Sequence, residues 1–209
     1  MVASPAPMGR RARVVGASVI ETSDDDEKAG DDALLAQAGA GDQRAFRTLV
    51  ARHLSRVLSL ARRMTGNVAE AEDVAQEAFL RAWQKAAVWH AGEARFSTWL
   101  YRVVVNLCLD RRRRKPTTPL EAAGDPLDPA PSIELRLVED QRTRIVAVAL
   151  AALPDRQRAA LVLSYYEELS NAAAAEILGV SVSALESLLV RARKALRAEL
   201  ERHRFAVLD

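Results

Sequence analysis

The chain has 209 residues, enough for one large domain or for two small domains and a linker. Hydrophobic residues make up 49% of it and aromatic residues 5%, with alanine and leucine dominant, which favours an all-helical protein. The net charge of +2 is modest, so its distribution along the chain decides whether a polyanion is a partner. The single cysteine, Cys108, excludes a disulfide framework and a cysteine-rich zinc site.

The first 30 residues are predicted to be a disordered tail. Small residues, prolines and three arginines precede an acidic run from Asp24 to Glu27, a composition that cannot bury enough apolar surface to fold. No apolar segment follows the arginines, so we expect no signal peptide, and no run approaches the length of a membrane span. A reducing, cytoplasmic setting fits the chain.

Two helices are predicted between Asp31 and Gly66. Asp31 or Asp32 is expected to cap the first, ALLAQA, and Asp42 the second, which Gly66 ends. One face of the second helix is apolar: Phe46, Leu49, Val50, Val57, Leu60, Ala61 and Met64. His53 lies on that face and is expected to be a packed core residue, because no second metal ligand is near it.

The helix predicted over 69–87 has two stripes. The core stripe consists of Ala71, Val74, Ala75, Ala78, Phe79, Ala82 and Trp83. The second stripe consists of Asp73, Gln76, Glu77 and Leu80. Its acids, amide and exposed leucine suit docking against a basic partner helix, although periodicity alone is equally compatible with a plain solvated face.

A loop with Trp89 and His90 leads to a helix, FSTWLYRVVVNLCLDRRRRK, which Ser97 is expected to cap. Residues 95–115 contain one acid, Asp110, and seven basic residues: Arg95, Arg102, Arg111, Arg112, Arg113, Arg114 and Lys115. Rings that stack on bases beside guanidiniums that neutralise phosphates are typical of single-stranded DNA binding. Four rings compete for that role, and we expect one or two to reach DNA: Trp89, Phe96, Trp99 and Tyr101.

Residues 116–134 are predicted to be an extended linker. They hold five of the eight prolines and four acidic residues, without a basic one. The linker separates the first domain, 31–115, from a second helical domain, 135–204, whose first helix begins near Ile133 and runs to Leu153. Pro154 is expected to start the next helix.

The stretch Leu169–Arg197 has the pattern of a helix-turn-helix. Ser170 is expected to cap a short alanine-rich helix, and Gly179 to end it in the left-handed conformation. Ser181 or Ser183 would cap the second helix; Ser183 and Glu186 have the spacing of a capping box. Its apolar stripe is Leu185, Leu188, Leu189, Ala192, Leu196 and Leu200, and the basic residues project elsewhere. On its own, this pattern is nearly as compatible with an amphipathic hairpin that has a solvated basic face.

Four motifs in order resemble the sigma-70 family of bacteria, specifically the short extracytoplasmic-function (ECF) sigma factors. They are AEDVAQEAFLRAW (Ala71–Trp83), FSTWLYRVVVNLCLDRRRR (Phe96–Arg114), LPDRQRAALVLSYYEELS (Leu153–Ser170) and AEILGVSVSALESLLVRARKAL (Ala175–Leu196). The resemblance covers roughly 31–200. It implies two small helical domains, sigma region 2 and a region 4 helix-turn-helix, joined by the flexible acidic linker.

The resemblance also implies site residues. In region 2, polymerase would be bound by Asp73, Gln76, Glu77 and Leu80. The minus-ten element would be opened and held by Trp89, Arg95, Phe96, Trp99, Asn106, Asp110, Arg111, Arg112, Arg113 and Arg114. In region 4, the minus-thirty-five element would be contacted in the major groove by Ser183, Glu186, Ser187, Val190, Arg191 and Lys194. The linker acids would follow the RNA exit path of the polymerase.

Two positions depart from the family pattern. Glu186 stands where a basic residue is usual, and it either accepts a hydrogen bond from cytosine N4 or completes the capping box, which we slightly favour. Asn171 and four alanines fill positions that are usually aromatic and acidic, which alters the polymerase-facing side of that helix.

The resemblance implies a dissociable polymerase subunit for a stress or envelope response, with core RNA polymerase, promoter DNA and an anti-sigma factor, often membrane-bound, as partners. One alternative is a mimic that sequesters an anti-sigma protein without touching DNA, but it has no need for the basic residues 111–115. A simple regulator using only the second domain leaves the first unexplained. No catalytic constellation, phosphate-binding loop or metal spacing is present in the sequence, so we expect no enzyme activity, cofactor or small-molecule substrate.

Overall fold

The computed structural model describes residues 14–15, 18–19, 30–90, 95–114 and 133–206. Within these ranges the chain is almost entirely helical, which confirms the predicted fold class. The strands described are β1 (Val14–Val15) and β2 (Ser18–Val19), which pair antiparallel with Val14 opposite Val19. They lie within the predicted disordered tail, whose other residues up to 29 are outside the described residues.

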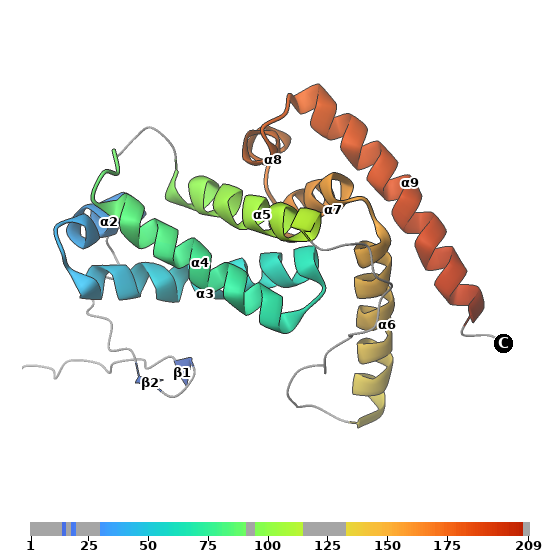
Figure 1. The fold of residues 1–209 in the computed structure, drawn as a ribbon. Coiled ribbons are helices and arrows are strands. Elements are labelled where there is room, and N and C mark those ends of the chain that lie inside the picture. The colour runs from blue at the N-terminus through green and yellow to red at the C-terminus, as the bar shows by residue number, and fades with distance from the viewer. Residues whose placement is uncertain (1–13, 16–17, 20–29, 91–94, 115–132, 207–209) are drawn as a thin grey trace, which may run out of the picture.

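The first domain consists of four helices: α2 (Asp31–Gly39), α3 (Gln43–Thr65), α4 (Val68–Ala86) and α5 (Phe96–Arg114). The long helix α3 is central and packs against the other three (Figure 1). The apolar stripes predicted for α3 and α4 face each other in the core, where most of their residues are buried.

Helix boundaries in this domain follow local capping chemistry. The Asp42 carboxylate accepts a hydrogen bond from the Arg44 backbone N–H at 2.8 Å and so caps α3. Gly66 ends α3 with φ of 72°, in the left-handed region where glycine has no steric penalty. Asn67 then caps α4 by accepting from the Glu70 N–H at 3.0 Å.

Three expected caps are wrong. Gly30 precedes α2, and Asp31 and Asp32 lie in its first turn without capping it. Asp31 instead accepts from buried His53 at 2.8 Å, and this hydrogen bond is the main cause that lowers the pKa of Asp31. Ser97 does not cap α5, because that helix already begins at Phe96.

The second domain contains α6 (Ile133–Ala152), α7 (Asp155–Leu161), a π-helical turn η1 (Val162–Tyr166), α8 (Asn171–Leu178) and α9 (Val182–Ala206). The predicted helix starts at 133 and after Pro154 agree with these bounds. The π-helical turn was not predicted from the sequence; it directly precedes the helix-turn-helix.

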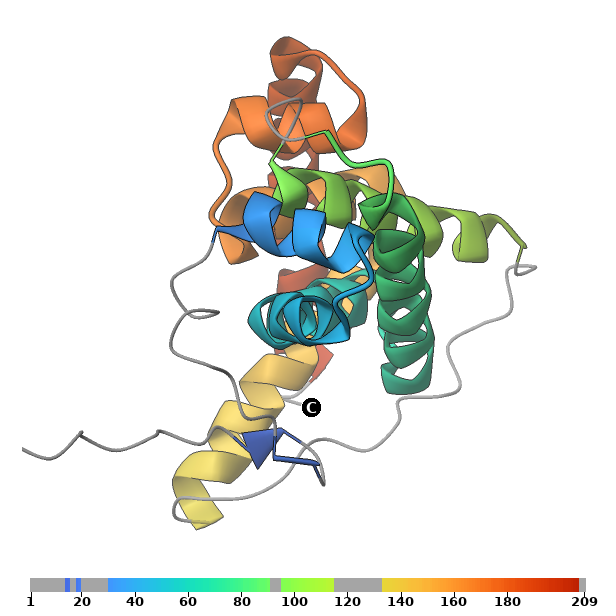
Figure 2. The same ribbon diagram turned by 90° about the vertical axis from the view of Figure 1, so that its left-hand side faces the viewer.

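The two domains pack against each other, which the sequence did not indicate. Helix α3 contacts α6, α7 and η1, and α5 contacts α8. In Figures 1 and 2, α8 lies over α5, and α6 runs across the end of α3. Buried residues of both domains belong to one continuous apolar cluster. Residues 115–132, which include most of the predicted linker, are outside the described residues.

Candidate polymerase and nucleic-acid interfaces

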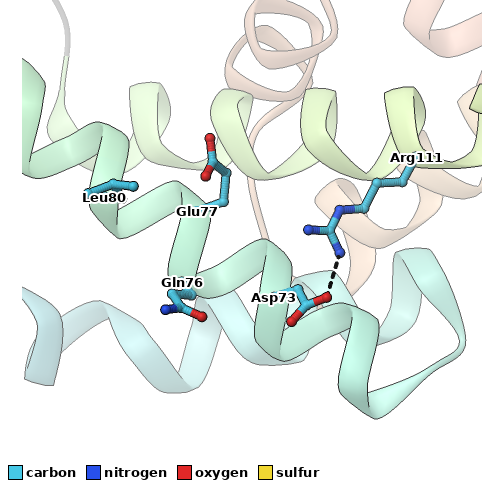
Figure 3. Close-up of a pocket in the computed structure, with 5 residues that line it drawn as sticks. All are labelled: Asp73, Gln76, Glu77, Leu80 and Arg111. Carbon is cyan, nitrogen blue, oxygen red and sulfur yellow. Dashed lines mark hydrogen bonds and ion pairs between the residues drawn. The ribbon is translucent and has the colours of Figure 1, made fainter.

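The second stripe of α4 forms an open surface, which we call the α4 face: Asp73, Gln76, Glu77 and Leu80. With Arg111 these residues line a shallow hollow between α4 and α5 (Figure 3). Leu80 is 50% exposed, although it is a large apolar side chain on a helix whose other large apolar residues face the core. Glu77 forms an ion pair with Arg81 one turn away at 2.8 Å. A single exposed leucine is ordinary on a protein surface, but together with the two carboxylates it forms a surface that an apolar and basic partner would complement.

Arg111 joins the α4 face to the basic end of α5. Its guanidinium reaches across from α5 to the Asp73 carboxylate at 3.3 Å (Figure 3). It also donates to the Glu70 carbonyl at 3.4 Å. The residues predicted to bind polymerase and those predicted to bind DNA are therefore neighbours. Sequence reasoning had treated them as separate surfaces, because 38 positions separate the two residues of this ion pair.

The aromatic residues at the start of α5 form one cluster. Trp89 packs edge-to-face against Phe96 and Trp99, with ring centroids 6.0 and 5.9 Å apart. Trp89 also donates its indole N–H to Asp32 at 3.1 Å. Phe96 is only 2% exposed and Tyr101 is 4% exposed, so both belong to the core and not to a base-stacking surface. Trp89 and Trp99 are half-buried and are therefore the partly exposed rings of this cluster.

The polar residues on the outer side of α5 are accessible. Arg95, Asn106 and Asp110 are exposed, and Arg113 lies 3.9 Å from Asp110. Arg112 is half-buried. The Arg114 side chain is outside the described residues. Most of the predicted minus-ten residues thus lie on α5, and Trp89 and Arg95 lie in the segment before it.

Helices α8 and α9 form the predicted helix-turn-helix, with a bend of 95° between them. Ser170 caps α8 by accepting from the Ala173 N–H at 3.3 Å, and Gly179 ends it with φ of 62°. Leu185, Leu189 and Ala192 are buried and fix the rotation of α9 about its axis. All six residues predicted to contact the minus-thirty-five element are exposed: Ser183, Glu186, Ser187, Val190, Arg191 and Lys194.

Of the two roles considered for Glu186, reading a base and completing a capping box, the structure excludes the capping box. Ser181, not Ser183, caps α9, because its hydroxyl accepts from the Ala184 N–H at 3.2 Å. Glu186 therefore lies in the second turn, too far along the helix for a capping box, and the capping role that we favoured is wrong. Its carboxylate is exposed and is 3.5 Å from the Asn171 side-chain amide.

Two family models match the chain: Sigma-70 region 2 over residues 49–117 and Sigma-70, region 4 over residues 143–196. The chain is also 37% identical over 184 residues to the ECF RNA polymerase sigma factor SigW of Bacillus subtilis, an alignment that covers 79% of this chain and 94% of SigW. The chain belongs to the sigma-70 family. The ECF resemblance seen in the sequence is thereby confirmed.

Other relatives agree with this assignment. The RNA polymerase sigma-H factor of Pseudomonas aeruginosa is 32% identical over 182 residues, covering 82% of this chain and 94% of that protein. Among solved structures, CnrH in complex with the cytosolic domain of CnrY matches with a TM-score of 0.63 and 31% identity, covering 82% of this chain and 97% of CnrH. The sigma factor RpoE of Bartonella quintana, solved with the anti-sigma factor NepR, shares the fold at a TM-score of 0.61 and 22% identity, covering 75% of this chain and 96% of RpoE.

As a sigma factor, this protein acts in promoter-directed transcription initiation, and its family consists of transcription regulators rather than enzymes. Within the described ranges, no single helix is long and apolar enough to cross a membrane; α8 and α9 reach the required hydropathy only as a bent pair. In the same ranges, no group of three or more His, Cys, Asp or Glu side chains could hold a metal ion.

Sequence reasoning missed Arg158, a residue of region 4 that is completely buried. It donates hydrogen bonds to the Leu150 carbonyl at 2.6 Å and the Leu153 carbonyl at 2.9 Å, and also to Ala151. Across the domain boundary it donates to the Met64 carbonyl at 2.6 Å. Burial lowers the pKa of Arg158 to about 10, so the guanidinium stays charged at neutral pH. No local pattern indicates this role, because the partners of Arg158 are backbone carbonyls, which every residue possesses.

Sequence reasoning also missed that basic residues of α5 contact region 4. Arg112 forms an ion pair with Asp155 at 2.9 Å. Arg102 donates to the Glu176 backbone carbonyl at 2.8 Å and lies 3.2 Å from the Glu176 carboxylate. These pairs join residues far apart in the sequence, so no local pattern indicates them.

Proposed function

We propose that this ECF sigma factor binds core polymerase through the α4 face, opens the minus-ten element with the loop and helix around α5, and reads the minus-thirty-five element with α9. The observation that carries the proposal is the placement of the α4 face beside the basic end of α5, linked by Arg111 and Asp73. A factor that melts DNA on the polymerase surface needs its docking and strand-holding residues next to each other.

The exposed residues of region 2 support the first two roles. The α4 face combines two carboxylates with an accessible leucine, which a partner surface of basic and apolar residues would complement. Trp89 and Trp99 are partly exposed, and Arg95 and Asn106 on the same stretch of chain are exposed, so unstacked bases could be held near neutralised phosphates. Phe96, being buried, is not part of this proposed surface.

Relatives of this chain support a proposal about its partners and setting. CnrH was solved with the cytosolic domain of CnrY, and RpoE of Bartonella quintana with the anti-sigma factor NepR. We propose that an anti-sigma factor, membrane-bound or free, likewise controls this protein in the bacterial cytoplasm, and that its promoters belong to a stress or envelope response.

Run-off transcription with bacterial core polymerase on genomic fragments tests the proposal. Transcripts with defined starts that depend on the added protein are expected. Stable core binding without transcripts would point to unsuitable promoters or a missing activator. Absence of core binding would contradict the proposal and favour the mimic that only sequesters an anti-sigma factor.

The leucine of the α4 face offers the most direct test of docking. Leu80→Asp is expected to weaken core binding about 10- to 100-fold, because it places a desolvated charge in an apolar contact. Titration of labelled core polymerase with the variant measures the affinity.

Val88→Asp is the matched control, since Val88 is an equally exposed apolar residue, 57% accessible, outside the α4 face. It should bind core like the natural protein. Equal losses for both variants would move the polymerase contact away from the α4 face.

Glu186 is expected to read a base. The donor that a glutamate typically reads in the major groove is cytosine N4, whereas glutamine pairs with adenine. Glu186→Gln should therefore shift the preference at one base pair of the minus-thirty-five element from cytosine to adenine, by about fivefold to tenfold. Binding of the protein–polymerase complex to a library of promoter variants measures this preference.

Glu201→Gln, an exposed acid later on α9, removes the same charge and should change no base preference. If Glu186→Gln strengthens binding equally for every sequence, the glutamate only repels phosphates and reads nothing.

A further inference from the structure

Helix α2 lies against the segment that leads into α5. At the C-terminal end of α2, a Cβ atom on Gly39 would be 2.5 Å from the Ala86 carbonyl oxygen, so only glycine allows the two backbones to approach this closely. In the first turn of α2, the Asp32 carboxylate accepts the indole N–H of Trp89 at 3.1 Å. Both ends of α2 therefore hold residues 86–89, where the chain leaves α4.

The turn of α2 that contains Asp32 is fixed to α3. Asp31 accepts from buried His53 at 2.8 Å and lies 3.2 Å from the Arg52 guanidinium. The ring of His53 in turn packs edge-to-face against Phe96, with centroids 5.3 Å apart. The Asp32 carboxylate therefore belongs to a turn that is tied to the central helix of the domain.

Trp89 links this turn to the rings at the start of α5. It packs edge-to-face on Phe96 and on Trp99, and the latter two rings are stacked with 23° between their planes. Phe96 is buried, whereas Trp89 and Trp99 are half-buried. Edge-to-face packing limits the tilt of an indole only weakly, whereas a directional hydrogen bond to a fixed carboxylate defines it. The hydrogen bond to Asp32 therefore sets the orientation of the Trp89 ring.

We propose that Asp32 is a positioning residue for promoter opening, because it orients the Trp89 ring on which an unstacked base is held. The inference rests on the proposed function in that Trp89 is taken as a strand-holding ring. Asp32 acts through the indole and not by contact with DNA, since a carboxylate repels phosphates. The site thereby includes a helix that precedes residues 49–117, the part of the chain that the region 2 model matches.

Two variants that differ mainly in hydrogen bonding test the proposal. Asp32→Asn and Asp32→Leu are nearly equal in size and both remove the charge, but only asparagine keeps an oxygen that can accept the indole N–H. We expect Asp32→Leu to bind a fluorescein-labelled oligothymidine about three- to tenfold more weakly than Asp32→Asn, because a misoriented ring loses part of its stacking on the base. Fluorescence anisotropy measures both affinities, and equal affinities would overturn the inference.

The background variant Trp89→Phe shows whether Asp32 acts through this ring. Phenylalanine keeps an aromatic ring but has no N–H to donate, so the two Asp32 variants should bind oligothymidine within about twofold of each other in that background. The same three- to tenfold difference there would overturn the inference, because Asp32 would then act by another route. Circular dichroism checks that each variant is folded, and Asp32→Ala, which also lacks an acceptor, replaces Asp32→Leu if leucine prevents folding.

These outcomes are distinct from those of the proposed function. Both Asp32 variants should bind core polymerase like the natural protein, because Asp32 lies outside the α4 face. If the natural protein does not initiate transcription, the proposed function fails, while the comparison of the Asp32 variants on oligothymidine still decides the inference. If the natural protein initiates transcription but does not bind oligothymidine even at low salt, the inference alone fails, since no strand-holding ring is then present to be positioned.

Discussion

Replacing Arg158 with methionine is expected to lower the free energy of unfolding by about 3 kcal/mol or more. The guanidinium donates to four backbone carbonyls; the Leu150 carbonyl also accepts from the Leu153 N–H at 3.1 Å, whereas the other three would lose this donor at a cost of about 1–3 kcal/mol apiece. Loss of a desolvated charge offsets part of that sum. Methionine keeps the unbranched apolar stem of the side chain but not the guanidinium, so the measured loss reports mainly on the hydrogen bonds and the charge of that group.

The position of the acceptors explains why one side chain matters this much. Leu150, Ala151 and Leu153 lie at the C-terminal end of α6 and just beyond it, and Met64 lies at the C-terminal end of α3. The last carbonyls of a helix have no partner within the helix, and the helix dipole makes them favourable acceptors for a cation. Arg158 therefore caps two helices from different domains at once.

Urea unfolding followed by circular dichroism measures the effect. Arg156→Met is the matched control: Arg156 is exposed on the same helix, and its replacement should change the free energy of unfolding by less than about 0.5 kcal/mol. Arg158→Lys should fall between, because an ammonium has three donors for four acceptors. A loss below about 1 kcal/mol in Arg158→Met would show that water or other groups satisfy the carbonyls.

Local sequence signals predicted much of the fold. Asp42, Gly66, Ser170 and Gly179 act through bonds to residues within four positions, so their caps and stops could be read directly. The apolar periodicity of α3 and α4 identified the core for the same reason. Ser181 and Ser183 were both suitable caps for α9 by residue type and position. Only the backbone shows where the helix begins, and therefore that Ser181 is the cap.

Contacts between distant segments could not be predicted in this way. Arg158 and Met64 are separated by 94 positions, and Arg102 and Glu176 by 74. A buried arginine has the same local pattern as an exposed one, because its partners are carbonyls that every residue possesses. The packing of region 4 on α5 likewise depends on the whole surface of both regions.

The candidate DNA surface shows the same limit. Aromatic and basic residues were correctly recognised as neighbours along the chain, but periodicity did not distinguish Phe96, which is buried, from Trp89 and Trp99, which are partly exposed. All six residues of the α9 surface are exposed, since their spacing of three and four residues is that of one helix face.

Replacing Arg111, Arg112, Arg113 and Arg114 together with alanine is expected to impair promoter opening while core binding stays nearly unchanged. Each lost phosphate contact lowers the salt dependence of single-strand binding by about 0.7 in the log–log slope, so the slope should fall by about 3. Oligothymidine affinity across a salt series gives the slope, and permanganate reactivity of unpaired thymines gives the extent of opening. An equal loss of core binding would show that the polymerase and DNA surfaces are misplaced.

Arg111 decides whether those two surfaces are independent. It is the arginine that contacts Asp73 of the α4 face, at 3.3 Å, whereas Arg113 is most closely paired with Asp110 on its own helix, at 3.9 Å. The Arg111–Asp73 pair is largely exposed and contributes at most about 1 kcal/mol. Arg111→Ala should therefore change core affinity by no more than about fivefold, and Arg113→Ala should not change it. A larger effect of Arg111→Ala, with Arg113→Ala silent, would mean that Arg111 itself touches polymerase and that docking and strand holding share one residue.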